Sequence, residues 1–226
     1  MRETIAGSER LPEVCDGTHL GSRLGAVVFA VAGTSFVAYS VLRPSGDTLS
    51  AMSTDAWLVS HLCGMAAFVL LVLGLDVLRA VVPGSVSRAA MTSGGLGVAA
   101  VLPYYGAEGY ALHAAGHLAL EDPGAAVVLG PLPDAFRLAP AAGSVFLIGL
   151  LAIAVGSVLA AVALWRSVWR SRAGVPLAVG YVLFLPQFFA PHEWRVAHGI
   201  LLGVGCGAVA ATIVRPPRTG PRSSER

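Results

Sequence analysis

The stretch Ala56–Leu75, AWLVSHLCGMAAFVLLVLGL, decides the fold class, because it contains no charged side chain along its whole length. An α-helix needs about 20 apolar residues to cross the hydrocarbon core of a bilayer. The whole chain has the same character: 55% of its residues are hydrophobic, 12% are charged, and its mean hydropathy is +0.73. Water-soluble domains carry roughly 25% charged residues. The sequence therefore indicates a membrane protein.

Several further segments are long and apolar enough to count as membrane spans. With the first stretch included, they are Leu24–Leu42, Ala56–Leu75, Ala89–Ala107, Pro140–Trp165, Ala173–Pro191 and Val196–Val214. The third segment contains Pro103 and the fifth contains Pro176 and Pro186, so these two are the weakest, because proline interrupts a helix. We predict an all-α fold, a six-span transmembrane helical bundle.

The arginines predict how this bundle is oriented. The 15 basic residues of the chain are all arginine, and short cytoplasmic loops retain basic residues. If both termini lie inside, only Arg43, Arg137 and Arg195 fall on the outer side, and all the others fall on the cytoplasmic side. We therefore expect a multi-pass protein of the bacterial plasma membrane with the N and C termini cytoplasmic.

The polar ends of the chain flank a single predicted domain. Residues 1–22 form a polar cytoplasmic segment, residues 23–214 the six-helix transmembrane domain, and residues 215–226 an Arg/Pro-rich cytoplasmic tail. The tail has too little apolar content to fold, so we expect it to be disordered. Its arginines fit a topology determinant, so the expected partner is the lipid bilayer and not nucleic acid. The sequence is also compatible with a homo-oligomer.

The segment Val41–Arg79 carries a resemblance to known sequences. A first span ends near Pro44, Trp57 and His61 open the next helix, and that helix finishes with Gly74–Leu78. In these features the chain is similar to a group of uncharacterised multi-span membrane proteins of GC-rich bacteria. The similarity covers the first two spans and part of the third. It implies a membrane location without an activity.

The pattern Trp-x-Val-small-His occurs twice, at residues 57–61 and again at residues 194–198. A helix turns once per 3.6 residues, so in each copy the tryptophan and the histidine share one helical face. We expect His61 and His198 at matching depth, where they could coordinate a shared transition metal or, with less support, a haem. Alternatively, the aromatic and histidine side chains form a belt at the membrane boundary.

The third span and its extension carry most of the remaining polar residues. Tyr110, His113 and His117 are spaced i, i+3 and i+7, which places them on one helical face. An ionisable residue at membrane depth is costly, so Glu108 is a functional candidate. We expect Tyr105, Glu108 and Tyr110 to bind a ligand in an outward-facing pocket. The expected metal ligands are His61, His113, His117 and His198.

These residues support three functional readings. The first is binding of a metal or a small ligand at the outer face. The second is a structural or small-molecule-passing membrane protein. The third is a zinc-dependent membrane hydrolase: His113 and His117 at i and i+4 resemble the pair in hydrolases related to adiponectin receptors and alkaline ceramidases, which have seven helices. Ala114 stands where a zincin has its general-base glutamate. We expect binding rather than catalysis.

Glycines recur along the last predicted span. Gly199, Gly203 and Gly207 lie four residues apart and therefore share one helical face. Small residues at this spacing allow helices to approach closely in lipid. We expect this face to pack against another helix.

Overall fold

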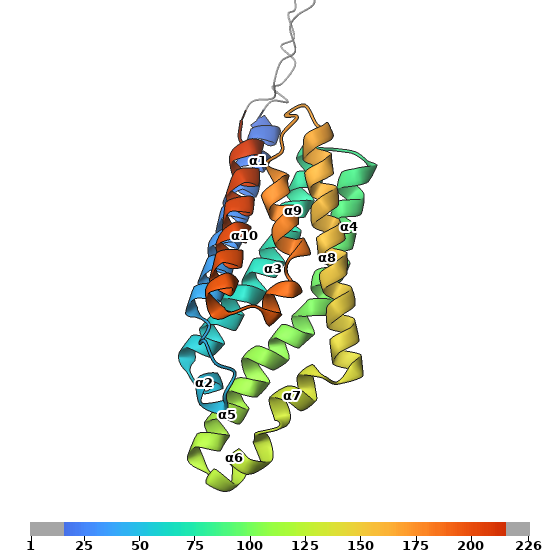
Figure 1. The fold of residues 1–226 in the computed structure, drawn as a ribbon. Helices are drawn as coiled ribbons and strands as arrows, with labels where there is room; N and C mark the ends of the chain where they lie inside the picture. The colour runs from blue at the N-terminus through green and yellow to red at the C-terminus, as the bar shows by residue number, and fades with distance from the viewer. Residues whose placement is uncertain (1–15, 216–226) are drawn as a thin grey trace, which may run out of the picture.

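The computed structural model describes residues 16–215, with side chains from residue 21 onward. All regular secondary structure in this range is helical, which confirms the predicted all-α class. Figure 1 shows long helices lying side by side, with the two described ends of the chain at one end of the bundle and a group of short helices at the other.

The helices differ widely in length. The long ones are α1 (Asp16–Leu42), α3 (Asp55–Val81), α4 (Ser85–Gly106), α8 (Pro140–Arg166) and α10 (His192–Ile213). The short ones are α2 (Leu49–Met52), the π-helix η1 (Ala107–Ala111), α5 (Leu112–Glu121), α6 (Pro123–Leu129), α7 (Leu132–Arg137), α9 (Gly174–Val182) and the 3₁₀ helix η2 (Pro186–Phe189).

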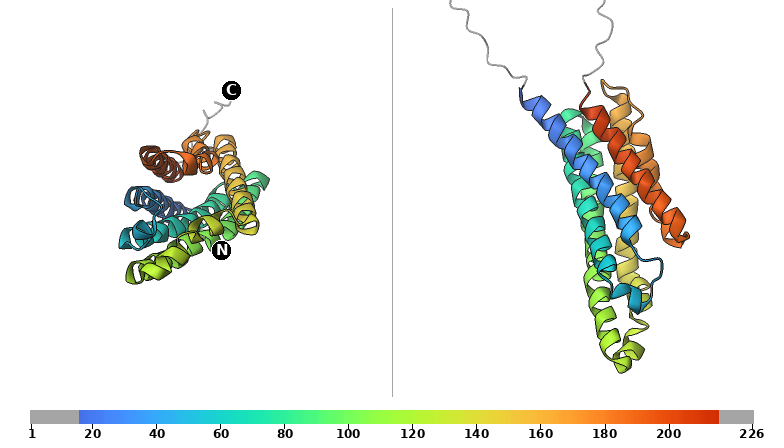
Figure 2. Two further views of the ribbon diagram at one scale, coloured as in Figure 1. Left: turned by 60° about the horizontal axis from the view of Figure 1, so that its bottom comes forward. Right: turned by 90° about the vertical axis from the view of Figure 1, so that its left-hand side faces the viewer.

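The long helices and α9 form a closed ring. Helix α1 packs against α3 and α10, α4 packs against α3 and α8, and α9 lies between α8 and α10. The left view of Figure 2 looks obliquely toward the end of this bundle. Neighbours in the ring run antiparallel where the connections are short, as at residues 82–84 and 167–173.

Four of the described helices are long and apolar enough to cross a membrane. They are Gly21–Leu42, Asp55–Val81, Pro140–Arg166 and His192–Ile213, in α1, α3, α8 and α10. The predicted count of six spans is therefore not supported. Helix α4 is long, but Arg88 and several serines in its first half lower its hydropathy.

Helix α9 is too short to span a bilayer. Its 9 residues rise about 14 Å, less than half of the roughly 30 Å hydrocarbon core. Proline has no N–H to donate, and its ring collides with the carbonyl group four residues earlier. For Pro186 that carbonyl belongs to Val182, where α9 ends. The predicted helix over Ala173–Pro191 is thus split into α9 and η2.

Glycines allow the closest helix contacts. A Cβ at Gly97 of α4 would lie 2.6 Å from the carbonyl oxygen of Gly149 in α8, so no larger residue fits there. The expected glycine face of α10 is confirmed in part. Gly199 and Gly203 pack against α1, whereas a Cβ at Gly207 would meet nothing within 4 Å. These contacts fit the packing role that small residues have in membrane helices.

Helix α1 begins at Asp16, inside the segment 1–22 that the sequence analysis treats as a separate polar region. Residues 1–15 and 216–226 lie outside the described residues, so the predictions for the first part of that segment and for the tail are untested. The tail prediction includes Arg215, which follows the end of α10.

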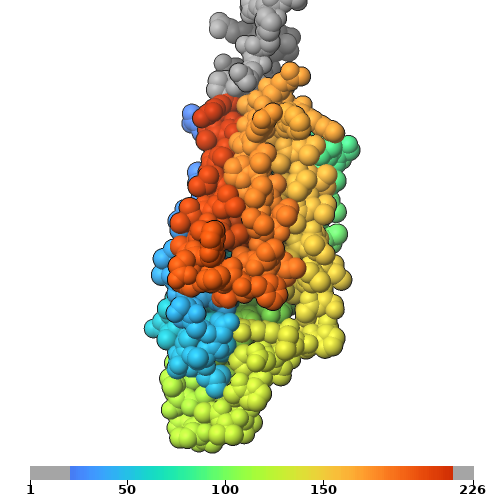
Figure 3. Space-filling view, viewed as in Figure 1, coloured from blue at the N-terminus to red at the C-terminus, as the bar shows by residue number. Residues whose placement is uncertain are grey.

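The short helices α2, α5, α6 and α7 form a cap at the end of the bundle away from the chain ends (Figures 1 and 3). Helix α5 continues from α4 through η1, and α2 packs on α5 so closely that a Cβ at Gly116 would lie 2.6 Å from the Leu49 carbonyl oxygen. After α5, residues 123–129 form α6 and residues 132–137 form α7. The cap brings the end of α7 next to η1 and the end of α1.

Candidate ligand-binding site

The candidate site lies where α1 ends, α3 begins and α4 passes into η1. Helix α1 stops at Leu42 because Arg43 precedes Pro44, and a residue before proline disfavours the helical conformation. Thr54 starts α3 by accepting a hydrogen bond from the Trp57 backbone N–H at 3.2 Å. These local signals place Arg43 and the first turns of α3 at the same end of the bundle.

Glu108 lies on the π-helix η1, one turn beyond Pro103. A π-helix is a widened helical turn. Such turns are rare in proteins, and those that occur are often at functional sites. The Leu112 N–H donates to the Ala107 carbonyl, five residues earlier, which is the pattern of such a turn. The Trp57 indole N–H donates to the Glu108 carbonyl oxygen at 2.8 Å, so it ties η1 to α3.

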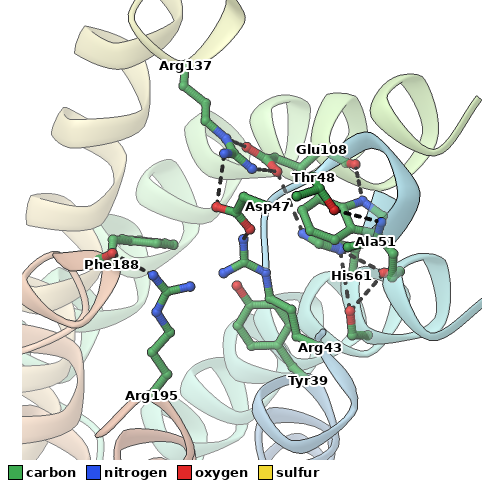
Figure 4. Close-up of polar contacts among 12 residues, drawn as sticks. Tyr39, Arg43, Asp47, Thr48, Ala51, His61, Glu108, Arg137, Phe188 and Arg195 are labelled. Carbon is green, nitrogen blue, oxygen red and sulfur yellow. Dashed lines mark hydrogen bonds and ion pairs between the residues drawn. The ribbon is translucent and has the colours of Figure 1, made fainter. Parts of the chain in front are cut away.

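Four charged side chains from three segments form a continuous chain of ion pairs (Figure 4). Arg137 of α7 binds Glu108 in a bidentate manner, from Nε at 2.6 Å and from a terminal nitrogen at 2.8 Å. Its other terminal nitrogen donates to Asp47 at 3.0 Å, and Arg43 donates to the second oxygen of Asp47 at 2.9 Å. Bidentate arginine–carboxylate pairs are among the strongest polar contacts in proteins.

Three of the four charged side chains are shielded from solvent. Glu108 is 6% exposed, Arg43 is 9% exposed and Arg137 is partly buried, whereas Asp47 is exposed. Burial alone lowers the pKa of the Arg137 guanidinium, but the hydrogen bonds and charge of Glu108 outweigh this effect and raise it above the ordinary value. Arg137 is therefore permanently charged.

His61 lies beside the buried glutamate. Its Nδ1 is 2.8 Å from the Trp57 carbonyl oxygen, which can only accept, so Nδ1 carries a proton. Its Nε2 faces the Glu108 carboxylate at 3.9 Å, which is too far for a direct hydrogen bond. The imidazole and the Trp57 indole pack with ring centroids 4.5 Å apart. His61 is fixed in place with one nitrogen turned to the acid.

These groups border a cavity of about 300 Å³. One part of its wall is charged, with Arg43, Asp47, Glu108, Arg137 and Arg195. Another part is aromatic and aliphatic, with Tyr104, Leu138, Phe146, Leu185, Phe188 and Phe189. Tyr39, His61 and Tyr105 complete the lining. The cavity therefore joins a polar wall and an apolar wall.

The structure brings together only some of the residues expected from the sequence. Tyr105, Glu108 and His61 line the cavity. Tyr110 is 55% exposed and points elsewhere. The expected association of Tyr110 with the other two ligand-binding residues is therefore not seen.

The other expected metal ligands lie in separate places. His113 is 2.8 Å from the Met52 carbonyl oxygen through Nδ1, and its ring contacts that of His117 on the exposed side of α5. His198 is 2.7 Å from the Gly180 carbonyl oxygen through Nε2, on the other side of the ring of helices. Among the described residues, no group of three or more His, Cys, Asp or Glu side chains could hold a metal ion.

Sequence reasoning missed the basic half of the site. Arg43, Arg137 and Arg195 were treated only as exceptions to the charge asymmetry, yet all three line the cavity. Their position on the less basic side was itself a usable signal, because arginine is disfavoured there without a specific partner. The pairing of Arg137 with Glu108 joins residues 29 positions apart, and no local pattern indicates it.

Comparison with known proteins finds no relative of this chain. No family model, no curated protein sequence and no solved structure matches the chain. The functional inference therefore rests on the geometry of the site.

Proposed function

We propose that the protein is a multi-pass protein of the bacterial plasma membrane that binds a small anionic ligand with an apolar body. Both termini lie in the cytoplasm, and the binding cavity opens toward the outer face. The observation that carries this proposal is the cavity of about 300 Å³, which has arginines on one wall and aromatic rings on the other. Small-molecule sites of about 300–1,000 Å³ typically combine apolar walls with a few polar groups.

The charges of the cavity favour an anion. Asp47 and Glu108 are each paired with arginine, so Arg43 and Arg137 balance them. Arg195 donates to the carbonyl oxygens of Ala190 and Phe188 at 3.0 and 2.9 Å, and no carboxylate among the described residues pairs with it. The lining therefore carries one positive charge in excess when His61 is neutral, and a carboxylate or phosphate on the ligand would offset it.

The other wall favours an apolar group on the same ligand. The Tyr104 and Phe146 rings stack with centroids 4.0 Å apart, and Phe188 packs edge-on against Phe146 at 5.7 Å. Phe189 is 85% exposed, so it offers apolar surface at the rim of the cavity. Aromatic rings in such a wall bind apolar groups by excluding water.

The membrane arrangement follows from the same residues. The four apolar helices support a multi-pass protein, and the arginine distribution supports cytoplasmic termini. We place α4 and the α9–η2 pair in the membrane as well, because each lies in the ring between helices that are long and apolar enough to span. In that position, Ser87 is buried and Ser93 donates to the Ala152 carbonyl oxygen of α8, so part of the polar surface of α4 faces protein.

Binding can be tested with three eight-carbon probes on protein in zwitterionic lipid nanodiscs. Isothermal titration calorimetry should show saturable binding of octanoate and no saturable binding of octanol or octylamine beyond their partition into empty nanodiscs. Arg195→Gln should weaken octanoate binding about tenfold, because a charge-assisted contact is lost. Arg79→Gln is the matched control, because Arg79 pairs with Asp76 on an exposed surface. Equal binding of the three probes would overturn the proposal.

A further inference from the structure

A second, much smaller cavity lies between α1, η2 and the start of α10. It measures about 10 Å³ and is bordered by Arg43 and Arg195, which also line the large cavity, and by Gln187, which does not. This is about the space that one water-sized particle needs. Figure 4 labels both arginines and shows Arg43 paired with Asp47.

Two buried donors at this cavity have no hydrogen-bond acceptor among the residues that the structure describes. They are Nε of Arg43 and Nε2 of Gln187, on side chains that are only 9% and 8% exposed. Nearly all buried polar groups in proteins are hydrogen-bonded, and an exception points to a bound water or ion. The two donors come from opposite sides of the cavity, one following α1 and one in η2.

Tyr39 also borders the small cavity. The Tyr105 hydroxyl donates to the Tyr39 hydroxyl at 3.3 Å, so Tyr39 retains its own proton to donate. Ser40 does not compete for the role, because its hydroxyl is directed at the carbonyl oxygens of Phe36 and Val37. Two histidines, His192 and His198, also border the cavity, and His198 donates through Nε2 to the Gly180 carbonyl oxygen.

The charge of the residues that line the small cavity favours a bound anion over a bound water molecule. Arg43 and Arg195 both border the small cavity, and no aspartate or glutamate is among the described residues that line it. Asp47 pairs with Arg43 at 2.9 Å, and no carboxylate among the described residues pairs with Arg195, so the lining keeps one positive charge in excess. This excess charge, beside two donors without acceptors, favours a bound negative charge, which water cannot supply.

We propose that this cavity holds a single monatomic anion, with chloride as the physiological ligand. Arg43 and Gln187 donate to it from α1 and η2, and Arg195 supplies the second positive charge. The ion links the broken α9–η2 segment to α1 and so stabilises this end of the bundle. This site shares Arg43 and Arg195 with the organic-anion site and differs from it by Gln187, which borders the small cavity alone.

The test compares sodium chloride, sodium bromide and sodium gluconate at constant ionic strength. In nanodiscs, the thermal unfolding midpoint should rise with halide concentration and saturate, because a ligand that binds only the folded state stabilises it. Gluconate, which is too large for the cavity, should have no such effect. An equal midpoint in chloride and gluconate means that the cavity holds only water, and it overturns the proposal.

Two variants and a direct measurement locate the ion. Gln187→Leu should raise the halide concentration for half-maximal stabilisation about tenfold, whereas Arg79→Gln, at an exposed ion pair, should leave it unchanged. If Gln187→Leu does not fold, crystals of the unmodified protein grown with bromide decide the question. Anomalous density between Arg43 and Gln187 supports the site, and bromide found only elsewhere overturns it. Octanoate binding is measured separately, so either proposal can fail alone.

Discussion

The two copies of Trp-x-Val-small-His have the same sequence pattern and opposite environments. In the first copy, Trp57 is fully buried and His61 is 2% exposed, next to the charged cavity. In the second copy, Trp194 is 69% exposed and His198 donates to a backbone carbonyl on α9. The pattern therefore fixes which side chains share a helical face, but it does not fix what that face meets.

The neighbouring elements explain the difference. The start of α3 is covered by η1, α5 and α2, which place Glu108, Leu112 and Met52 around Trp57. The start of α10 has no such cover, because α9 ends at Val182 and η2 is a single short turn. One proline on the fifth segment thus decides whether the second tryptophan becomes part of a core.

The sharpest test of this comparison is to remove each tryptophan. Trp57→Ala should lower the free energy of unfolding by about 3–5 kcal/mol, because it leaves a cavity and an unpaired Glu108 carbonyl. Trp194→Ala is the matched control and should change it by less than about 0.5 kcal/mol. Equilibrium unfolding in mixed micelles with increasing SDS, followed by circular dichroism, measures both. Similar losses would show that the two sites are equally packed in the membrane.

The second test concerns the carboxylate beside His61, which has no counterpart beside His198. Glu108→Gln should cost about 3 kcal/mol, because it leaves the partly buried Arg137 with one acidic partner in place of two. Asp76→Asn breaks an exposed arginine pair and should cost less than about 1 kcal/mol. The same unfolding titration compares them. If the two losses are equal, the ion-pair chain around Glu108 is as solvated as a surface pair.

Much of the scaffold is predictable from residue type and order. The uncharged run from Ala56 predicts α3, and the apolar segment from Pro140 predicts α8 with its first residue correct. Pro186 was recognised as a weak point, but periodicity and length could not show whether it would kink the helix or end it. In the structure the helix ends before Pro186, and Arg195 holds the Phe188 and Ala190 carbonyl oxygens at the far end of η2.

The site was less predictable because its parts are distant in sequence. Arg43 and Asp47 are local to each other, but Asp47 meets Arg137 across 90 positions. A histidine within an apolar helix gives no indication of its neighbours, so His61 and His198 could not be distinguished. Arg43, Arg137 and Arg195 gave the better signal, because they are the exceptions to the predicted arginine asymmetry, and two of these three have carboxylate partners.

The smallest effect is expected at the second histidine. His198→Phe keeps the ring and its contact with Phe184 but removes the hydrogen bond to the Gly180 carbonyl, so it should cost about 1 kcal/mol. His117→Phe, on the exposed side of α5, should change the free energy of unfolding by less than about 0.5 kcal/mol. Both are measured by the same SDS titration. A loss at His198 several times larger than about 1 kcal/mol would mean that the second copy of the pattern stabilises the fold as the first does. The two copies would then differ only in their solvent exposure.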